Sequence, residues 1–205
     1  MAKLPRRLIL AVAVAAPLIL AACNRAPDAP PKPSFKAIDI TGADYANKLD
    51  LPDADGHMRH LSDFKGKIAV VFFGYTQCPD VCPTTMLELA QAKKALGADG
   101  AKVIGIFVTV DPERDTPAVL KAYVANFSPD FIALRGTPDE VKAAAKNFKV
   151  FYSKVPGATP ETYTIDHTAG SYVFDTQGRV RLFTRYGSGV DALASDLKTL
   201  LAEKS

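Results

Sequence analysis

Two cysteines and one distant histidine are the residues of this sequence whose types and spacing could carry chemistry. Cys78 and Cys82 lie between a strongly apolar run and a predicted helix, and His167 follows much later in the chain. Sulfur atoms at a helix N-terminus face unpaired N–H groups, which stabilise the thiolate. Two thiolates and an imidazole form a soft three-ligand set that suits Cu(I) and tolerates Cu(II). A structural zinc site usually has four ligands, and no fourth Cys or His lies nearby.

The same cysteine pair could instead exchange disulfides. A thioredoxin-type catalyst normally has two residues between its cysteines and a proline before the facing strand. Here three residues separate the cysteines, and residues 166–170 contain no proline. A peroxiredoxin keeps a threonine three residues before its reactive cysteine, whereas Thr76 is only two residues before Cys78. These departures favour a metal site. Two alternative functions are still compatible with the sequence: a thiol–disulfide oxidoreductase, and a redox or copper sensor in which residues 154–164 move.

The elements around these residues predict an α/β fold. Residues 67–73 and 103–110 are apolar runs rich in β-branched and aromatic residues, typical of strands buried on both faces of a sheet. Alternating strands and helices imply right-handed βαβ units. Four helices are expected: from about Pro83, from Pro117 after a Thr116 cap, from a capping box at Thr137, and from about Val190. A short strand is expected at 131–134, and residues 171–174 and 180–184 should form an antiparallel hairpin.

This order predicts a thioredoxin-like mixed sheet flanked by helices. A turn at residues 53–56 between two short strands adds an N-terminal β-hairpin extension. His167 is expected in the loop just before the strand at 171–174. In a thioredoxin-like fold, that loop approaches the start of the cysteine-bearing helix.

The first residues predict export. Lys3, Arg6 and Arg7 precede an uncharged, alanine-rich run that is short for a membrane span. Leu20-Ala21-Ala22-Cys23 resembles the lipobox of bacterial lipoproteins, in which the cysteine is acylated. The predicted organisation is a lipoprotein signal peptide at 1–22, the lipidated Cys23 with a proline-rich tether at 23–36, and a thioredoxin-like copper-binding domain at 37–205.

Charge and compartment narrow the function further. The net charge of +3 is accounted for by the three basic residues of the leader, so the exported chain is neutral. A neutral chain lacks the basic footprint of a nucleic-acid-binding protein. The oxidising compartment outside the cytoplasm allows the Cys78/Cys82 pair to form a disulfide.

Three motifs resemble the Sco/SenC family of copper proteins. They are residues 73–83 (Phe-Gly-Tyr-Thr-Gln-Cys-Pro-Asp-Val-Cys-Pro), residues 110–117 (Val-Asp-Pro-Glu-Arg-Asp-Thr-Pro), and Asp166-His167-Thr168 followed by Tyr172 and Asp175. Their order matches the family over roughly residues 37–203. The resemblance implies that Cys78, Cys82 and His167 bind copper. It also implies service to the binuclear copper centre of cytochrome c oxidase, as a metallochaperone or as a reductase of the oxidase cysteines.

The expected partners and location follow from the resemblance and from the lipobox. The expected protein partners are the copper-bearing oxidase subunit and a second periplasmic copper chaperone. The family commonly has a membrane-spanning anchor, and here the lipobox at Cys23 predicts contact with the membrane through a lipid anchor instead. The protein is expected to be a membrane-anchored lipoprotein facing the bacterial periplasm. Asp80, Asp166 and Asp111 are candidates to orient the ligands, whereas His57 and His60 are expected on the surface of the N-terminal hairpin.

Overall fold

The computed structural model describes residues 33–159 and 162–203, and the elements below belong to the unit Ser34–Ser205. The predicted signal peptide and Cys23, together with most of the predicted tether, lie outside the described residues. Among the residues that are described, none of the helices combines the length and the apolar character needed to cross a bilayer.

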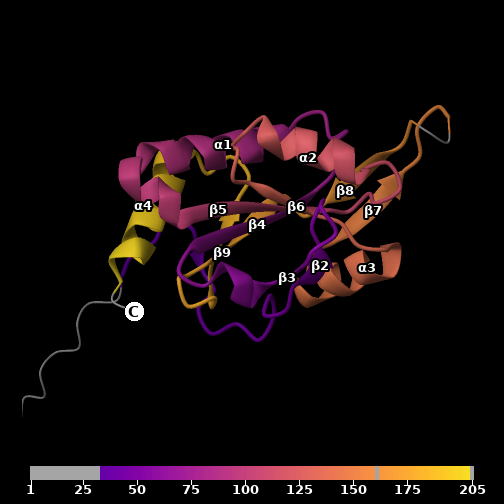
Figure 1. Ribbon diagram of the computed structural model, residues 1–205. Helices are drawn as coiled ribbons and strands as arrows, with labels where there is room; N and C mark the ends of the chain where they lie inside the picture. The colour runs from indigo at the N-terminus through magenta and orange to yellow at the C-terminus, as the bar shows by residue number, and fades with distance from the viewer. Residues whose placement is uncertain (1–32, 160–161, 204–205) are drawn as a thin grey trace, which may run out of the picture. The chain divides into compact units, whose positions relative to one another are not determined.

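A six-stranded mixed sheet forms the centre of this unit (Figure 1). The neighbours β4, β5 and β6 run parallel, and β9, β10 and β1 extend the other side of β4 through antiparallel pairs. Every residue of β4 and β5 is buried, as the two apolar runs predicted. In spatial order the strands are β1 (Ile38–Asp39), β10 (Val180–Arg185), β9 (Gly170–Phe174), β4 (Ile68–Gly74), β5 (Val103–Thr109) and β6 (Ile132–Leu134).

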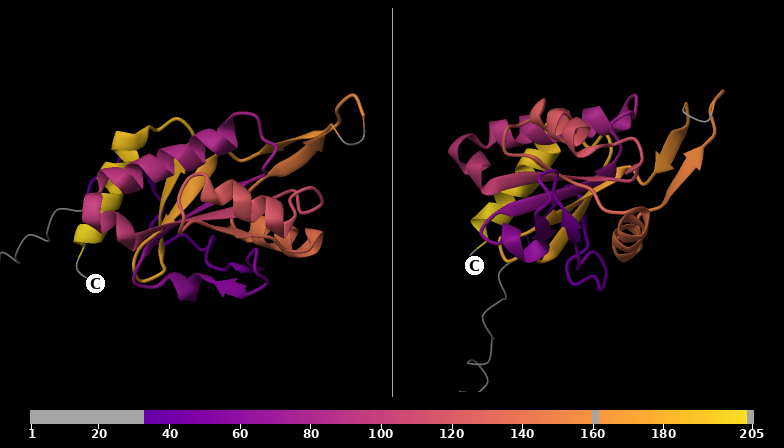
Figure 2. Two further views of the ribbon diagram at one scale, coloured as in Figure 1. Left: turned by 45° about the horizontal axis from the view of Figure 1, so that its top comes forward. Right: turned by 45° about the vertical axis from the view of Figure 1, so that its right-hand side comes forward.

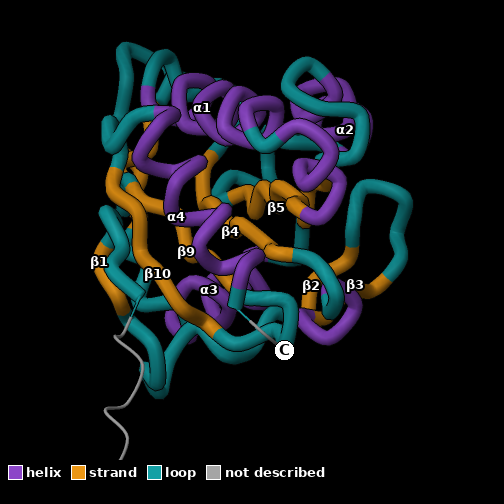
Figure 3. The backbone as a smooth tube through the Cα atoms, turned by 90° about the vertical axis from the view of Figure 1, so that its left-hand side faces the viewer, coloured by secondary structure: helices purple, strands orange, loops and turns teal. Residues whose placement is uncertain are grey.

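Helices cover both faces of the sheet, which confirms the predicted fold class. Three helices, α1 (Val81–Ala95), α2 (Pro117–Ala125) and α4 (Val190–Ala202), lie on one face. The fourth, α3 (Pro138–Asn147), lies on the opposite face near β2 (Asp50–Pro52) and β3 (Met58–His60), the predicted N-terminal hairpin (Figures 1 and 3). Two short 3-10 helices, η1 (Leu61–Phe64) and η2 (Gly97–Lys102), complete the connections.

The predicted caps begin α2 and α3. The Thr116 hydroxyl accepts a hydrogen bond from the backbone of Val119 at 3.3 Å, with proline at the first helical position. Thr137 and Glu140 form the predicted reciprocal capping box. By contrast, α1 begins at Val81, earlier than predicted, because a proline in the first turn removes an N–H that has no intrahelical partner anyway.

A second hairpin, absent from the sequence prediction, carries His167. The strands β7 (Tyr152–Val155) and β8 (Thr164–His167) form a two-stranded antiparallel sheet (Figure 2). The prediction of a loop at His167 was therefore wrong, since this residue ends β8. In β8 only Ile165 is buried and β7 has no buried residue, so the segment lacks the alternation of apolar and polar residues that identifies strands.

Aromatic packing fixes the point where this second hairpin leaves the core. The ring of Phe148, which follows α3, lies 5.1 Å from the rings of both Phe73 and Tyr172. The Tyr172 hydroxyl donates a hydrogen bond to the Phe148 carbonyl at 2.5 Å. Because Phe148 is fully buried, truncating it to alanine would cost about 3–5 kcal/mol. The start of β7 is thus attached to the central sheet.

Candidate metal centre

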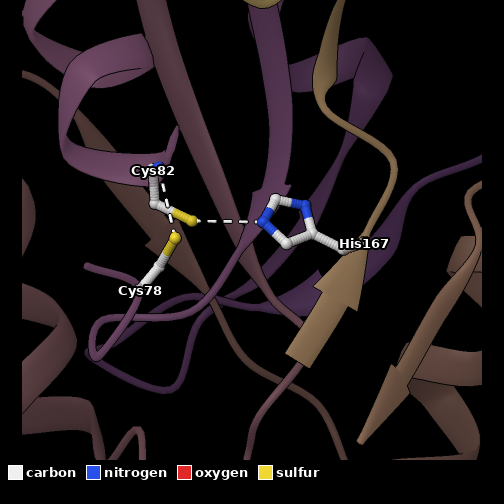
Figure 4. A group of neighbouring side chains, drawn as sticks. All are labelled: Cys78, Cys82 and His167. Carbon is white, nitrogen blue, oxygen red and sulfur yellow. Dashed lines mark hydrogen bonds between the residues drawn. The ribbon is translucent and has the colours of Figure 1, made fainter. Parts of the chain in front are cut away.

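The sheet topology brings the two cysteines and the histidine to one edge. Cys78 and Cys82 follow the carboxyl end of β4. Strand β9 runs antiparallel to β4, with Ser171 opposite Phe72, so the residues that precede β9 lie at that same edge. His167 is among them, as the close-up shows (Figure 4). The fold prediction that this segment faces the cysteine-bearing helix start is therefore confirmed.

The three side chains converge closely enough to share one ion. The two sulfur atoms and an imidazole nitrogen all lie within 4.8 Å of one another. Cys82 Sγ is 3.4 Å from His167 Nε2, and the Cys82 backbone N–H donates to Cys78 Sγ at 3.4 Å. Cys82 is buried, whereas Cys78 and His167 are half-buried. The donor set is soft and reachable from solvent, which fits copper.

Gly74 makes room for the buried sulfur. A Cβ atom at this position would lie 2.7 Å from Cys82 Sγ and 2.9 Å from the Phe72 ring, closer than side-chain atoms approach. The absence of a side chain therefore lets Cys82 pack over the end of β4. The sequence analysis included Gly74 in the motif of residues 73–83 but gave it no role in the site; the available signal was a glycine that ends an apolar strand before a cysteine motif.

The imidazole is held so that Nε2 faces sulfur. His167 Nδ1 lies 3.2 Å from the Thr168 carbonyl. A carbonyl oxygen can only accept, so this contact uses Nδ1 as a donor and leaves Nε2 as the ring nitrogen that faces the sulfur atoms. The rings of Phe72 and Tyr75 meet the imidazole edge to face, with centroids 5.7 and 6.1 Å away. These contacts orient the ring in the metal-free protein.

The two thiols differ in proton affinity. A hydrogen bond from the Cys82 thiol is the main factor that lowers the pKa of Cys78 to about 3; burial opposes it, and His167 and the backbone N–H groups of Asp80 and Cys82 assist. Burial raises the pKa of Cys82, and the neighbouring Cys78 raises it further. At neutral pH the pair therefore holds one thiolate and one thiol, and both cysteines are free.

The three aspartates predicted to orient the ligands lie in different environments. Asp111 is buried and accepts hydrogen bonds from Arg114 and from the Tyr163 hydroxyl. The carboxylate of Asp80 is exposed, with the hydroxyls of Thr84 and Tyr186 at 3.3–3.4 Å. The Asp166 side chain is exposed. The contact that orients the imidazole comes instead from a backbone carbonyl.

The other two histidines lie away from this centre. His57 and His60 are exposed on the N-terminal hairpin, as predicted. His60 Nδ1 lies 2.6 Å from Asp50, and His57 Nδ1 lies 3.6 Å from Asp53. These are local side-chain contacts within or beside the hairpin. Within the described ranges, Cys78, Cys82 and His167 are the group that could hold a metal ion.

Fold and site together define a thioredoxin-like protein whose Cys-x₃-Cys pair is completed by a histidine into a metal-binding set. The family described as SCO1/SenC matches residues 39–202, and the chain belongs to this family. A SCO2-like protein of Rickettsia felis is 33% identical over 153 residues, covering 73% of this chain and 75% of the relative.

Solved structures agree with this assignment. Copper-bound ScoI of Bradyrhizobium japonicum is 40% identical with a TM-score of 0.67, covering 74% of this chain and 96% of that chain. BsSco, described as a member of the Sco family of cytochrome c oxidase assembly proteins and as containing a disulfide switch, is 25% identical with a TM-score of 0.61. That match covers 81% of this chain and 99% of BsSco.

Proposed function

We propose that this protein is a metallochaperone that binds one copper ion through Cys78, Cys82 and His167. The ion is cargo: it is delivered to the binuclear copper centre of the copper-bearing subunit during cytochrome c oxidase assembly. The observation that carries the proposal is the convergence of two sulfur atoms and Nε2 within 4.8 Å. Copper in a similar ScoI and the oxidase-assembly role given for BsSco support it.

The protonation pattern suits a cargo site. When copper is bound, it supplies a soft Lewis acid that thiolates prefer. Cys78 already holds a thiolate, and Cys82 must release its proton on binding. Half-exposure of Cys78 and His167 leaves a side of the site open to an acceptor protein. An exchangeable ion needs such access, whereas a structural metal is usually enclosed.

Copper titration of the purified chain tests the ligand set. Wild type should bind one copper per chain, and the Cu(II) form should show thiolate-to-metal absorption. His167→Ala should weaken binding by about 100-fold, measured by competition with a Cu(I) chelator, because one of three ligands is lost. Stoichiometric binding of unchanged affinity in His167→Ala would refute the proposal. His60→Ala, at an exposed histidine beside Asp50, is the matched control and should leave copper affinity unchanged.

A second candidate function is reduction of the oxidase cysteines. Free thiols with a low-pKa, half-exposed Cys78 and a protonated Cys82 favour it, because a thiolate attacks a disulfide and the second thiol resolves the mixed disulfide. A reductase assay on an oxidised copper-site peptide separates the two functions. Reduction that persists in His167→Ala would support the reductase, whereas reduction that is absent in wild type would exclude it.

The attachment of the protein rests on its first residues. We infer acylation at Cys23 after removal of residues 1–22, with residues 23–36 as a tether and residues 37–205 as the copper-binding domain facing the periplasm. A second periplasmic copper chaperone is the proposed donor. Mass spectrometry of the membrane-bound protein tests the anchor, since Cys23→Ser should abolish the lipid mass and release the protein from the membrane.

A further inference from the structure

Side-chain contacts, rather than a backbone ladder, must hold the hairpin that carries His167. Within the described residues, β7 and β8 pair with each other and not with the six-stranded sheet. Two residues separate His167 from the start of β9, so the hairpin joins the main sheet directly after the histidine. Within β8, Ile165 is the one buried residue. The distance from the imidazole to the two sulfur atoms therefore depends on contacts from another segment.

Residues 111–115, here called the bridging loop, occupy the position needed to supply these contacts. They follow β5, which is parallel to β4. They therefore lie at the same edge of the sheet as residues 75–82, here called the cysteine segment. A hydrogen bond from Val110 N–H to the Gly74 carbonyl at 2.8 Å continues this pairing beyond the strands. The loop contains none of the three ligands, yet two of its acidic residues are fully buried.

One end of the bridging loop holds the cysteine segment. The carboxylate of Asp115 accepts hydrogen bonds from the Thr76 hydroxyl at 2.6 Å and from the Thr76 backbone N–H at 3.1 Å. It also accepts from the Thr109 hydroxyl at 2.6 Å, at the end of β5. Because Thr76 lies two residues before Cys78, these bonds fix the backbone that presents the first sulfur.

The other end of the bridging loop holds the histidine hairpin through Tyr163, the residue before β8. The Tyr163 hydroxyl donates to Asp111 at 2.7 Å, and Arg114 Nη1 donates to the Tyr163 carbonyl at 2.8 Å. The Arg114 guanidinium lies 3.6 Å from the Tyr163 ring centroid and donates to Asp111 at 2.5 Å. It also lies 5.8 Å from the ring of Tyr75, in the cysteine segment.

We propose that the bridging loop positions His167 relative to the cysteine pair before copper arrives. The positioning residues are Arg114, Asp115 and Tyr163. They act through the segments that carry the ligands, and not by binding the copper ion themselves. The proposal rests on the copper-binding function proposed above. Holding the two ligand-bearing segments in place means that less order must be gained on binding, which tightens binding and slows release. Loss of such supporting contacts typically weakens metal sites by about 10- to 100-fold.

The test compares Tyr163→Phe and Arg114→Gln in the wild-type and His167→Ala backgrounds. Tyr163→Phe removes one hydrogen bond and keeps the ring beneath Arg114, so it tests the contact even if Arg114→Gln fails to fold. With His167 present, each variant should weaken Cu(I) affinity by about 10-fold in chelator competition. In His167→Ala, the same substitutions should change affinity by less than about 2-fold, because the loop acts through the imidazole.

Hydrogen exchange of the copper-free protein gives a second, independent readout. Both variants should speed exchange of the β8 amides by about 10-fold and leave the β9 amides unchanged. Arg179→Gln is the matched control: it breaks another arginine contact to a buried aspartate, Asp175, and should alter neither measurement.

Three results would overturn the inference. They are an equal loss of affinity in both backgrounds, no loss of affinity in either background, and unchanged amide exchange in β8. If His167→Ala itself leaves copper affinity unchanged, the proposed ligand set fails instead. The exchange result in the copper-free protein then decides alone whether the bridging loop holds the hairpin.

Discussion

The two halves of the metal site are built in contrasting ways. The cysteine half follows β4, a central strand buried along its whole length, and Cys82 sits in the first turn of α1. The histidine half lies on a mostly exposed two-stranded hairpin outside the main sheet. One half is thus fixed by the core of the fold, and the other is fixed by a few side-chain contacts. The difference suggests that the cysteines set affinity and the histidine tunes it.

The largest expected effect comes from removing the half-buried thiolate of the cysteine half, Cys78. Cu(I) prefers soft thiolates to imidazole, so loss of a sulfur ligand should cost about 4 kcal/mol, or about 1,000-fold in affinity, against about 100-fold for the nitrogen ligand. Cys78→Ser should therefore weaken Cu(I) binding by about 1,000-fold, which chelator competition would measure. This exceeds the loss expected for His167→Ala. An equal or larger loss in the histidine variant would break the comparison, because the hairpin would then dominate affinity.

The pH dependence of thiol alkylation sharpens the contrast within the cysteine half. The pKa of Cys78 is lowered to about 3, so its charged form is present throughout the range above about pH 4. Its iodoacetamide reaction rate should change by less than about 2-fold from pH 5 to 8, whereas an ordinary thiol would gain nearly 1,000-fold. Mass spectrometry of each cysteine separates the sites, and Cys82, whose pKa is raised, should react slowly.

A serine at the second cysteine tests the cause of that shift. The Cys82 thiol is the largest contributor to the lowered pKa of Cys78. In Cys82→Ser the alkylation rate of Cys78 should regain part of its rise with pH. A Cys78 rate that climbs about 10-fold per pH unit in wild type would contradict the assignment of the thiolate.

Overpacking beneath the buried sulfur should produce a moderate effect. A methyl group at Gly74 would collide with Cys82 Sγ, so Gly74→Ala should cost about 1–3 kcal/mol of stability and also weaken copper binding by about 10-fold. Gly105→Ala is the matched control, since its Cβ would meet Phe131 and Leu89, which are remote from the ligands. Denaturant unfolding should show similar losses, with copper affinity reduced only in Gly74→Ala. Equal affinity losses would remove the special role of Gly74.

The smallest effect is expected at the acid that precedes the histidine. The Asp166 side chain is exposed, and the Thr168 carbonyl already orients the imidazole. Asp166→Asn should therefore change copper affinity by less than about 2-fold, because an exposed charge acts weakly through water. A 10-fold loss in chelator competition would show that the hairpin uses this carboxylate after all.

The contrast between the cysteine half and the histidine half also explains which features could be predicted from the sequence. The apolar runs of β4 and β5, the Thr116 and Thr137 caps and the β9–β10 hairpin are local patterns, and all were predicted. The cysteine spacing and its place before α1 are local as well. These features need no knowledge of distant residues.

The remainder depends on tertiary contacts. The β7–β8 hairpin has little apolar alternation, so it was expected to be a loop. Tyr163 gave no signal, because its role arises from Arg114 and Asp111, about 50 positions earlier in the chain. Gly74 could be linked to Cys82 only once the helix start was placed over the strand end. His167 was assigned through the motif resemblance and the expected loop approach, not through its own neighbours.

X-ray absorption of the copper-loaded chain tests the central claim most directly. Two sulfur scatterers and one imidazole nitrogen are predicted around a single copper ion, and the imidazole signal should disappear in His167→Ala. A wild-type spectrum without two sulfur ligands, or a spectrum that is identical in His167→Ala, would contradict the shared site.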